Sequence, residues 1–251
     1  MANPAPAASP VALITGSARR IGATIARTLH DHGMRVLIHY HHSDAEAEAL
    51  AAQLNAIRAD SARLLRADLD DPEAVRTLAR QAMDSYGQID LLVNNASRFY
   101  PTPVGQAEDA DWERLVHSNM RAPFILSQAL TPALREQQGA IINIVDVYAE
   151  KPLREHTLYC MAKAGLAMMT RSLARELGPS IRVNGVSPGP ILWPESGQLN
   201  QQAITESTAL KRCGDPQDIA DAVLWLGCQA PFVTGQILAV DGGRSLAFSG
   251  S

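Results

Sequence analysis

Residues 11–22 read VALITGSARRIG, an apolar run that passes directly into a glycine-containing loop. The run Val11–Thr15 lacks polar alternation, which is typical of a strand covered on both faces. The stretch Ile21–His32 that follows has helical patterning. Glycines in such a loop let the backbone approach a pyrophosphate, and the helix N-terminus offers unpaired N–H groups and a favourable dipole. The loop alone is compatible with an ordinary strand–helix turn, but as the first turn of a longer alternation it indicates a dinucleotide site.

Outward from this loop, short apolar runs alternate with amphipathic stretches to the end of the chain. The predicted strands are Val11–Thr15, Arg35–Tyr40, Arg63–Ala67, Asp90–Asn94, Ala140–Val145, Ile181–Val186 and Ile237–Val240. The predicted helices are Ile21–His32, Asp44–Ile57, Pro72–Tyr86, Trp112–Glu136, Leu158–Leu177 and Pro216–Gly227. Regular alternation implies right-handed crossovers between parallel strands. We therefore expect an α/β fold, a Rossmann-like doubly wound parallel sheet of about seven strands with helices on both faces.

The chain shows no linker, repeat or charge block that would divide it. Residues 1–10, rich in alanine and proline, are expected to be a disordered tail, and residues 11–251 a single domain. The one long irregular stretch, residues 187–210, is rich in proline and glycine. A loop of that length in a compact domain is usually a functional lid or a flexible segment, so we expect the substrate loop there.

The overall composition excludes several classes of partner. With 22 Lys and Arg against 26 Asp and Glu, the net charge is −4, which gives no footprint for nucleic acid or an anionic membrane. The three widely spaced cysteines indicate reduced thiols, and the N-terminus lacks the features of a signal peptide. No apolar run approaches the roughly 18 residues that span a bilayer. A cytoplasmic location is expected.

The end of the second predicted strand reads His-Tyr-His-His-Ser at residues 39–43, with no acid before Asp44. An NAD enzyme usually places an acid here to bond the ribose 2′-hydroxyl, whereas a 2′-phosphate needs donors and positive charge. Arg19, His41, His42 and Ser43 could supply them, so NADPH is favoured and its affinity should weaken as imidazoles lose their protons. Each histidine taken singly could equally be a solvated strand end. A metal site is not expected, because no carboxylate or thiol cluster accompanies these histidines.

Tyr159 and Lys163 lie four residues apart in a helical pattern, which puts both on one face. A nearby ammonium favours a phenolate, so Lys163 is expected to lower the pKa of Tyr159 and make it a usable proton donor. As a bare pair, Y-x-x-x-K is common on helix surfaces by chance. The dinucleotide loop upstream makes chance a poor explanation.

From about residue 10 onward the chain resembles the short-chain dehydrogenase/reductase family, and within it the pteridine reductase branch. The motifs that carry the resemblance are T-G-x-x-x-x-I-G at residues 15–22, N-N-A-S at 94–97, Y-x-x-x-K at 159–163 and V-D-G-G at 240–243. Arg20 stands where most of the family has a glycine, as in pteridine reductases, and such a residue requires a loop adapted to a side chain. Bacterial dihydromonapterin and dihydrofolate reductases are also similar.

The resemblance implies roles for individual residues. Asn119, Asp146, Tyr159 and Lys163 match the family's catalytic tetrad. The implied cofactor contacts are Gly16, Ser17, Arg19, Arg20, Ile21, Gly22, Tyr40, His41, His42, Ser43, Asp68, Leu69, Asn95, Ala96, Ser97, Tyr159, Lys163, Pro188, Gly189 and Ile191. The implied substrate contacts are Arg20, Ser97, Phe99, Asp146, Tyr159, Leu192 and Trp193. Phe99 would be an aromatic plate over a flat pterin, although the residue alone fits core packing equally well.

Asp146 is the informative departure, because most of the family has a serine there that donates to a substrate carbonyl. An ionised carboxylate cannot donate and would repel a developing alkoxide. A nitrogen heterocycle reduced at C=N bonds suits it better. We therefore expect an NADPH-dependent pteridine reductase acting on biopterin, a dihydropterin or dihydrofolate.

Two other functions stay open at this point: a carbonyl reductase of the 3-oxoacyl type and a catalytically silent NADPH-binding regulator. The resemblance also implies a homotetramer, with Trp112–Glu136 and Leu158–Leu177 as candidate interface helices.

Overall fold

The computed structural model describes residues 9–191 and 201–246. Within them, seven strands form one sheet in the order β3-β2-β1-β4-β5-β6-β7, and every neighbouring pair is parallel. The strands are β1 (Val11–Ile14), β2 (Arg35–Tyr40), β3 (Ala62–Arg66), β4 (Leu91–Asn94), β5 (Ala140–Ile144), β6 (Arg182–Pro188) and β7 (Ile237–Val240). The order reverses between β1 and β4, so the predicted doubly wound α/β fold is confirmed.

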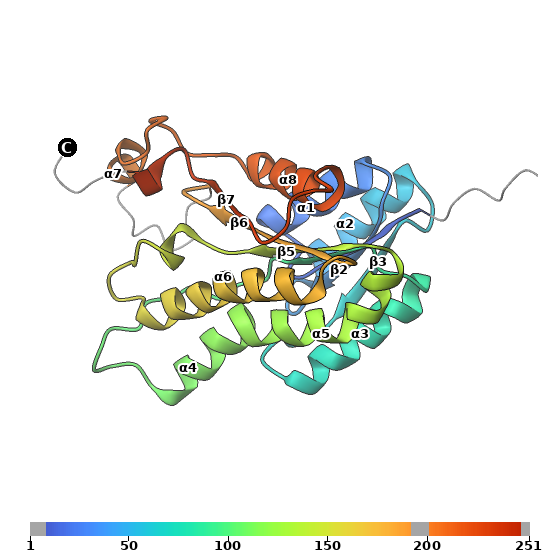
Figure 1. The fold of residues 1–251 in the computed structure, drawn as a ribbon, viewed down its shortest axis with the longest axis horizontal. Coiled ribbons are helices and arrows are strands. Elements are labelled where there is room, and N and C mark those ends of the chain that lie inside the picture. The colour runs from blue at the N-terminus through green and yellow to red at the C-terminus, as the bar shows by residue number, and fades with distance from the viewer. Residues whose placement is uncertain (1–8, 192–200, 247–251) are drawn as a thin grey trace, which may run out of the picture.

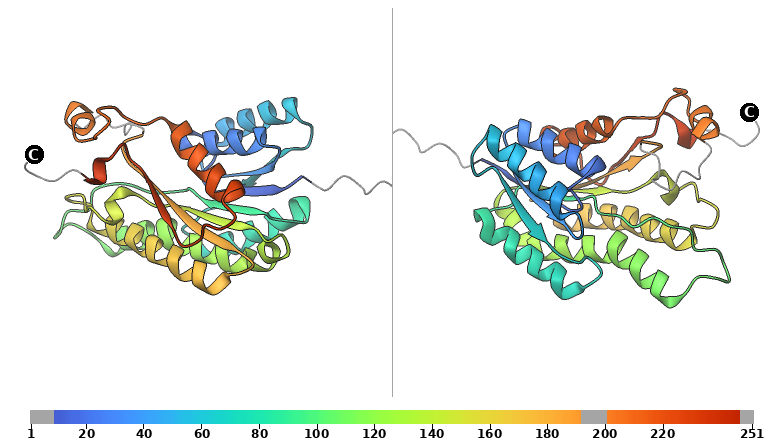
Figure 2. Two further views of the ribbon diagram at one scale, coloured as in Figure 1. Left: turned by 45° about the horizontal axis from the view of Figure 1, so that its top comes forward. Right: turned by 180° about the vertical axis from the view of Figure 1, so that it is seen from behind.

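Helices cover both faces of this sheet, as Figures 1 and 2 show. The α-helices are α1 (Arg20–Asp31), α2 (Asp44–Ile57), α3 (Pro72–Tyr86), α4 (Asp109–Val116), α5 (Ala122–Glu136), α6 (Thr157–Leu177), α7 (Gln201–Glu206) and α8 (Pro216–Leu224). Helices α1, α2 and α8 lie on one face, while α3, α5 and α6 lie on the other. No helix in the described part of the chain is long and apolar enough to cross a bilayer.

The apolar strands are explained by the two cores that they separate. Along β1, Ala12 and Ile14 pack into the core under α1, α2 and α8, whereas Val11 and Leu13 pack into the core over α3, α5 and α6. All four residues are fully buried. Side chains alternate across a strand, so a strand between two cores must be apolar at every position.

Two predicted elements differ in the structure. The helix expected from Trp112 begins at Asp109, because Glu108 and Asp111 form a reciprocal capping box at its N-terminus. The same helix is interrupted by a π-helical turn at His117–Arg121 before α5 begins. Within the stretch predicted to be irregular, β6 continues to Pro188 and α7 is helical. Residues 192–200, including Leu192 and Trp193, lie outside the described residues, as do residues 1–8 of the predicted tail.

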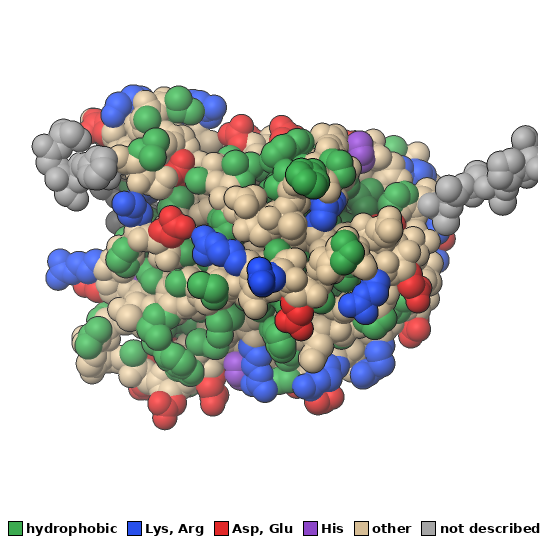
Figure 3. All heavy atoms as spheres, viewed as in Figure 1, with side chains coloured by type: hydrophobic (Ala, Val, Ile, Leu, Met, Phe, Trp, Pro, Cys, Tyr) green, Lys and Arg blue, Asp and Glu red, His purple; other side chains and the backbone are tan. Residues whose placement is uncertain are grey.

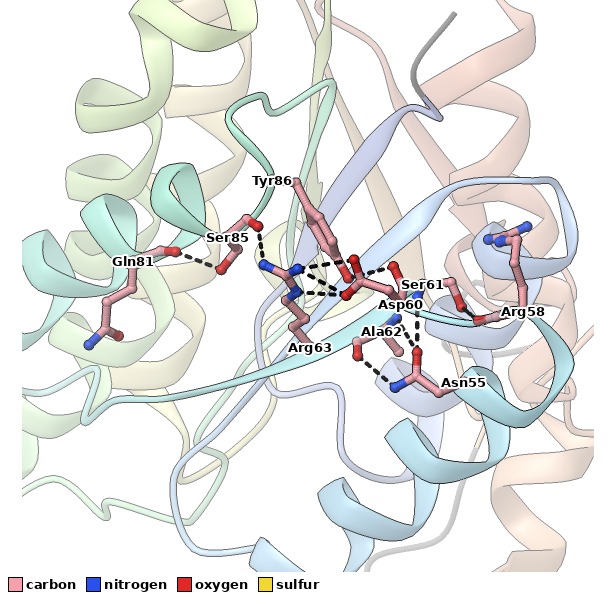
Figure 4. Close-up of polar contacts among 9 residues, drawn as sticks. All are labelled: Asn55, Arg58, Asp60, Ser61, Ala62, Arg63, Gln81, Ser85 and Tyr86. Carbon is pink, nitrogen blue, oxygen red and sulfur yellow. Dashed lines mark hydrogen bonds and ion pairs between the residues drawn. The ribbon is translucent and has the colours of Figure 1, made fainter. Parts of the chain in front are cut away.

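A polar cluster closes the turn between α2 and β3 (Figure 4). The Asn55 amide accepts from the backbone N–H of Ser61 and donates to the carbonyl of Ala62 at 2.8 Å. Arg63 pairs with Asp60 and lies 4.2 Å from the ring centroid of Tyr86, whose hydroxyl donates to the Asp60 carbonyl. Because these contacts surround the N-terminal end of β3, the cluster fixes the sheet at the end opposite the dinucleotide loop.

Candidate active site

The carboxyl ends of β1 to β4 border a cavity of about 480 Å³. Its lining residues come from the end of β2, from the loops that follow these four strands, from the start of α1 and, for Ser118, from the π-helical turn. They are Gly16, Ala18, Arg19, Arg20, Ile21, Gly22, His39, Tyr40, His41, His42, Ser43, Asp68, Leu69, Asp70, Asn95, Ala96, Ser97, Arg98 and Ser118. The cavity lies at the topological switch point, where open α/β sheets bind their ligands. Most of the predicted cofactor contacts are therefore brought together.

Two glycines allow the loop after β1 to pack closely. Gly16 has φ of +61°, and a Cβ on it would lie 2.9 Å from the Cα of Ala96. A Cβ on Gly22 would lie 2.4 Å from the carbonyl oxygen of Gly16. Asn95 locks this arrangement by donating its side-chain amide to the carbonyls of Thr15, at 2.9 Å, and Gly16, at 3.0 Å. The closely packed loop that dinucleotide binding needs is thus present, and a side chain at Gly16 or Gly22 would clash with the backbone.

Arg20 differs from expectation in its backbone. We expected a loop adapted to a side chain, but Arg20 has φ of +55°, the left-handed region that favours glycine. The loop keeps the glycine-type conformation and carries an arginine in it, at a cost of about 1 kcal/mol. Strain of this kind is typical of functional sites, and the side chain of Arg20 lines the cavity.

Ser17, which was also predicted as a cofactor contact, is fully buried and is not among the residues that line the first cavity. Its hydroxyl donates to the carbonyl of Ile14 at 2.8 Å, and its N–H donates to the carbonyl of His39 at 2.9 Å. Both groups are therefore used inside the protein. Ser17 holds the loop against β1 and β2.

His39 is a residue of this site that the sequence analysis missed. Its Nδ1 accepts from the N–H of Gly16 at 3.0 Å, and its Nε2 donates to the carbonyl of Ala67 at 3.2 Å. These two bonds require a neutral ring. Burial lowers the pKa of His39 to about 4, which keeps it neutral. A histidine directly after the apolar run Val36–Ile38 of this strand was the available signal.

We predict that His39 makes the protein acid-sensitive. Its pKa is about 4 when folded and near 6.5 when unfolded, so its contribution is complete above pH 6.5 and is lost as the pH falls towards 4. The loss should reach about 3 kcal/mol. Urea unfolding at several pH values should show the stability difference between the wild type and His39→Gln shrinking on acidification. Parallel curves would contradict the prediction.

The segment after β2 places four predicted contacts on one wall of the cavity. The rings of His41 and His42 stack at 3.6 Å, and His41 Nδ1 lies 3.7 Å from a carboxylate oxygen of Asp68. Tyr40 and Ser43 line the same wall. The His-Tyr-His-His-Ser sequence is therefore part of the site and not a remote strand end.

Asn119 lies fully buried in the π-helical turn, and two segments hold its amide. Its Oδ1 accepts from the Ser97 hydroxyl at 2.7 Å, and its Nδ2 donates to the carbonyls of Arg98 and Leu115. Arg98 is itself anchored, because its guanidinium bonds Asp70 at 2.7 Å. Arg98 and Asp70 were not predicted, although both belong to loops that follow predicted strands.

Tyr159 and Lys163 enter the site from the first turns of α6, and Asp146 from the end of β5. The Tyr159 hydroxyl donates to Asp146 Oδ2 at 2.6 Å, and Asp146 Oδ1 accepts from the N–H of Tyr148 at 2.9 Å. Lys163 Nζ donates to the carbonyl of Ile144 at 2.9 Å. The predicted tyrosine, carboxylate and lysine thus share one buried site.

Comparison with known proteins agrees with this arrangement. Residues 16–245 match the family model described as enoyl-(acyl carrier protein) reductase. The chain belongs to the short-chain dehydrogenase/reductase family. It is 37% identical to pteridine reductase 1 of Leishmania tarentolae, over 95% of this chain and 97% of that protein. It is also 34% identical to a 3-oxoacyl-(acyl-carrier-protein) reductase of Staphylococcus aureus, over 92% of this chain and 96% of that protein. The identity to trans-4-hydroxycyclohexanecarboxylate dehydrogenase of Sinomonas cyclohexanicum is likewise 34%, over 95% of this chain and 93% of that protein.

This short-chain dehydrogenase/reductase is accordingly an oxidoreductase of a family that uses nicotinamide cofactors. Its relatives act on different substrates, as their names show. The substrate therefore has to be argued from the site.

The pKa of Tyr159 in this short-chain dehydrogenase/reductase is shifted in the direction opposite to the one expected. Burial lowers the pKa of Lys163 to about 8, so the ammonium is only partly protonated above neutral pH. Burial, and then the charge of Asp146, raises the pKa of Tyr159 well above its usual value, so the expected lowering by Lys163 is wrong for this structure. Burial also raises the pKa of Asp146. Tyr159 therefore holds its proton tightly and donates it to Asp146 in one short hydrogen bond.

Phe99 lies beside Tyr159 and outside the main cores of this short-chain dehydrogenase/reductase. Its ring meets the Tyr159 ring edge-on at 4.9 Å and stacks on His156 at 4.6 Å. It remains 41% exposed. The core-packing alternative therefore fails, and His156 joins Phe99 as an aromatic neighbour that the sequence analysis missed.

The segment after β6 is packed against the end of β7 in this short-chain dehydrogenase/reductase. A Cβ on Gly189 would lie 2.5 Å from the Cα of Asp241. Ile191 is buried and lines a second cavity of about 500 Å³, not the one described above. Pro188, Gly189 and Ile191 were predicted as cofactor contacts, and the structure places them outside the lining of the first cavity. Among the described residues no three His, Cys, Asp or Glu side chains gather in a way that could hold a metal ion.

Proposed function

We propose that the protein is a cytoplasmic NADPH-dependent pteridine reductase, with residues 11–251 as one catalytic domain. It would transfer hydride to a C=N bond of a pterin or folate. The observation that supports this most is the 2.6 Å hydrogen bond between Tyr159 and Asp146 at the end of β5. A carboxylate at this point cannot donate to a ketone oxygen, whereas the pair can deliver a proton to a ring nitrogen.

The residues around the first cavity fit NADPH. Gly16 and Gly22 leave room for a pyrophosphate, and Arg19, His41 and Ser43 line the wall where a 2′-phosphate would need donors. Guanidinium and imidazolium groups are suited to phosphate oxygens. Bound NADPH would supply the hydride.

The proton would come from the protein. Tyr159 gives its proton to the ring nitrogen beside the carbon that receives hydride, so that C=N becomes CH–NH. The phenolate that would remain lies beside Asp146 Oδ2, which accepts from the Tyr159 hydroxyl at 2.6 Å and can pass a replacement proton from solvent to it. Lys163, fully buried and bonded to the Ile144 carbonyl, adds positive charge near both groups. Asn119 positions Ser97 at the cavity wall.

The test is to follow NADPH consumption with biopterin, dihydrobiopterin, dihydromonapterin, dihydrofolate and an acetoacetyl thioester in parallel. We expect turnover on at least one pteridine and negligible turnover on the thioester. Rapid reduction of the thioester with none of the pteridines would overturn the proposal and favour a 3-oxoacyl carbonyl reductase. The observation that favours a 3-oxoacyl reductase is the 34% identity to the Staphylococcus aureus enzyme.

We predict that His41 and His42, whose rings stack at 3.6 Å on the cavity wall, contribute to NADPH binding. Imidazole N–H groups can donate to the 2′-phosphate, so a variant carrying both His41→Ala and His42→Ala should bind NADPH several-fold more weakly, with little change in its affinity for NADH. Fluorescence titration would measure both Kd values. An unchanged Kd for NADPH in the variant would refute the prediction.

We also propose a homotetramer, because apolar side chains gather over α4 and α6 in the view of Figure 3. Trp112, Phe124 and Met168 are each between 45% and 62% exposed, and Leu238 lies on the edge strand β7. Apolar exposure of this extent marks association surfaces. With 27.0 kDa per chain, light scattering should give about 108 kDa, and Met168→Glu should yield smaller species. A 27.0 kDa wild type would exclude the tetramer.

A further inference from the structure

We infer that Arg66 determines the preference for NADPH, because it neutralises Asp44 beside the cavity wall where a 2′-phosphate would bind. This inference rests on the proposed use of NADPH and assigns a residue that governs it. Arg66 is the last residue of β3 and was not among the predicted site residues. It is not among the residues that line the first cavity, so it acts on the ligand through its neighbours.

Arg66 lies directly beside the wall of the first cavity that carries the histidines. β3 is the edge strand next to β2, and Arg66 is paired in register with Tyr40, the last residue of β2. The Nε of Arg66 donates to the carbonyl of the next residue, His41, at 3.2 Å. Tyr40 and His41 both line the cavity. Arg66 therefore holds the segment after β2, which is where a dinucleotide fold discriminates between a ribose 2′-hydroxyl and a 2′-phosphate.

The same guanidinium compensates a carboxylate at the end of this segment. Asp44 is the first residue of α2 and follows Ser43, which lines the cavity. Its Oδ1 lies 3.6 Å from Nη1 of Arg66. Without a counter-charge, Asp44 would repel a 2′-phosphate, and an acid near the end of the second strand is the feature that favours NAD. Arg66 therefore removes a charge that would favour the wrong coenzyme.

A second carboxylate at the cavity is balanced in the same way. Asp70 lines the cavity, and its Oδ2 lies 2.7 Å from Nη2 of Arg98. Both Asp44 and Asp70 are thus matched by a guanidinium, which keeps its charge at every pH at which proteins are studied. A phosphate monoester carries about two negative charges near neutral pH, so it is sensitive to any carboxylate left unbalanced nearby. The two arginines together keep the cavity open to such an anion.

The pair of Arg66 and Asp44 can be removed without disturbing the fold. The two side chains are 59% and 50% exposed, and exposed ion pairs contribute little to stability. The strand ends are held by other bonds: the N–H of Ala67 donates to the carbonyl of Tyr40 at 3.2 Å, and Nε2 of His39 donates to the carbonyl of Ala67 at 3.2 Å. A change in coenzyme affinity in these variants would therefore report on charge.

The test measures the Kd of NADPH and of NADH by fluorescence titration at low ionic strength in the wild type, Arg66→Gln and the double variant Arg66→Gln/Asp44→Asn. In Arg66→Gln we expect the Kd of NADPH to rise about fivefold and that of NADH to change less than about twofold, because only NADPH carries the phosphate that Asp44 would repel. In the double variant the Kd of NADPH should return to within about twofold of the wild type, because the repelling charge is gone. Added salt should weaken the effect of Arg66→Gln.

Arg171→Gln is the matched control. Arg171 is 47% exposed, lies 3.8 Å from one carboxylate, that of Glu150, and belongs to α6 on the other face of the sheet, so both Kd values should stay unchanged. A double variant that binds NADPH as weakly as Arg66→Gln would overturn the inference, because the charge of Asp44 would then not be the cause. A preference for NADPH that is equal in wild type and Arg66→Gln would overturn it too, while the proposed cofactor stands. A wild type that prefers NADH would overturn both.

Discussion

Replacing Tyr159 with phenylalanine is expected to lower kcat for a dihydropterin by roughly a thousandfold. The hydroxyl is the group that would donate the proton, and it is held 2.6 Å from Asp146. Phenylalanine keeps the ring, with its edge-on contact to Phe99 at 4.9 Å, so the change removes one oxygen and little packing. No other hydroxyl donates to Asp146 among the described residues, and compensation is not expected.

Single-turnover measurements of NADPH oxidation would test this, alongside NADPH binding by fluorescence. Binding should change little, because the altered group is a proton donor and not part of the first cavity. Tyr86→Phe provides the matched control, since it removes a hydroxyl bonded to Asp60 at the opposite end of the sheet. A Tyr159→Phe enzyme that keeps a tenth of its kcat would show that Tyr159 is not the donor.

Asp146→Ser is the second change with a large expected effect. It should reduce kcat/KM for pteridines by about a hundredfold and introduce measurable reduction of an acetoacetyl thioester. The carboxylate accepts from Tyr159 and from the N–H of Tyr148, and burial raises its pKa. A serine hydroxyl donates to a carbonyl oxygen and carries no charge to repel an alkoxide.

Asp146→Asn separates charge from shape. The amide has the size of the carboxyl group but cannot relay a proton, so pteridine reduction should also fall about a hundredfold without any gain on the thioester. Both variants would be assayed with both substrates and checked for NADPH binding. If Asp146→Ser keeps full pteridine activity, the carboxylate does not determine the substrate class.

The sequence predicted those parts of the site that depend on strand ends. In a parallel sheet the carboxyl ends of all strands lie at one edge, so residues after β1, β2, β4 and β5 had to meet. That is why Gly16, His41 and Asn95, which line the first cavity, could be placed together without coordinates. The placement of Tyr159 and Lys163 on one helix face was predicted from their spacing of four residues.

Other features depend on tertiary contacts that no local pattern contains. Arg20 has a left-handed backbone in a loop whose Gly16 packs on Ala96 and whose Gly22 packs on Gly16 and Asn95, whereas its side-chain type alone indicated the opposite. His39 looked like one more histidine at a strand end, but its burial and two bonds make it structural. The raised pKa of Tyr159 reflects burial, which the spacing of Tyr159 and Lys163 does not report.

The π-helical turn at His117–Arg121 has a geometric consequence for the outside of the molecule. Twelve positions separate Trp112 from Phe124, and on an unbroken α-helix this spacing would put their side chains about 120° apart. A π turn takes up one extra residue, so the effective separation is about eleven positions and the angle closes to roughly 20°. Both aromatic rings are 45% exposed. The extra residue of the π-helical turn that contains Asn119 therefore brings the side chains of Trp112 and Phe124 to nearly the same angle around the helix axis, on the outer surface.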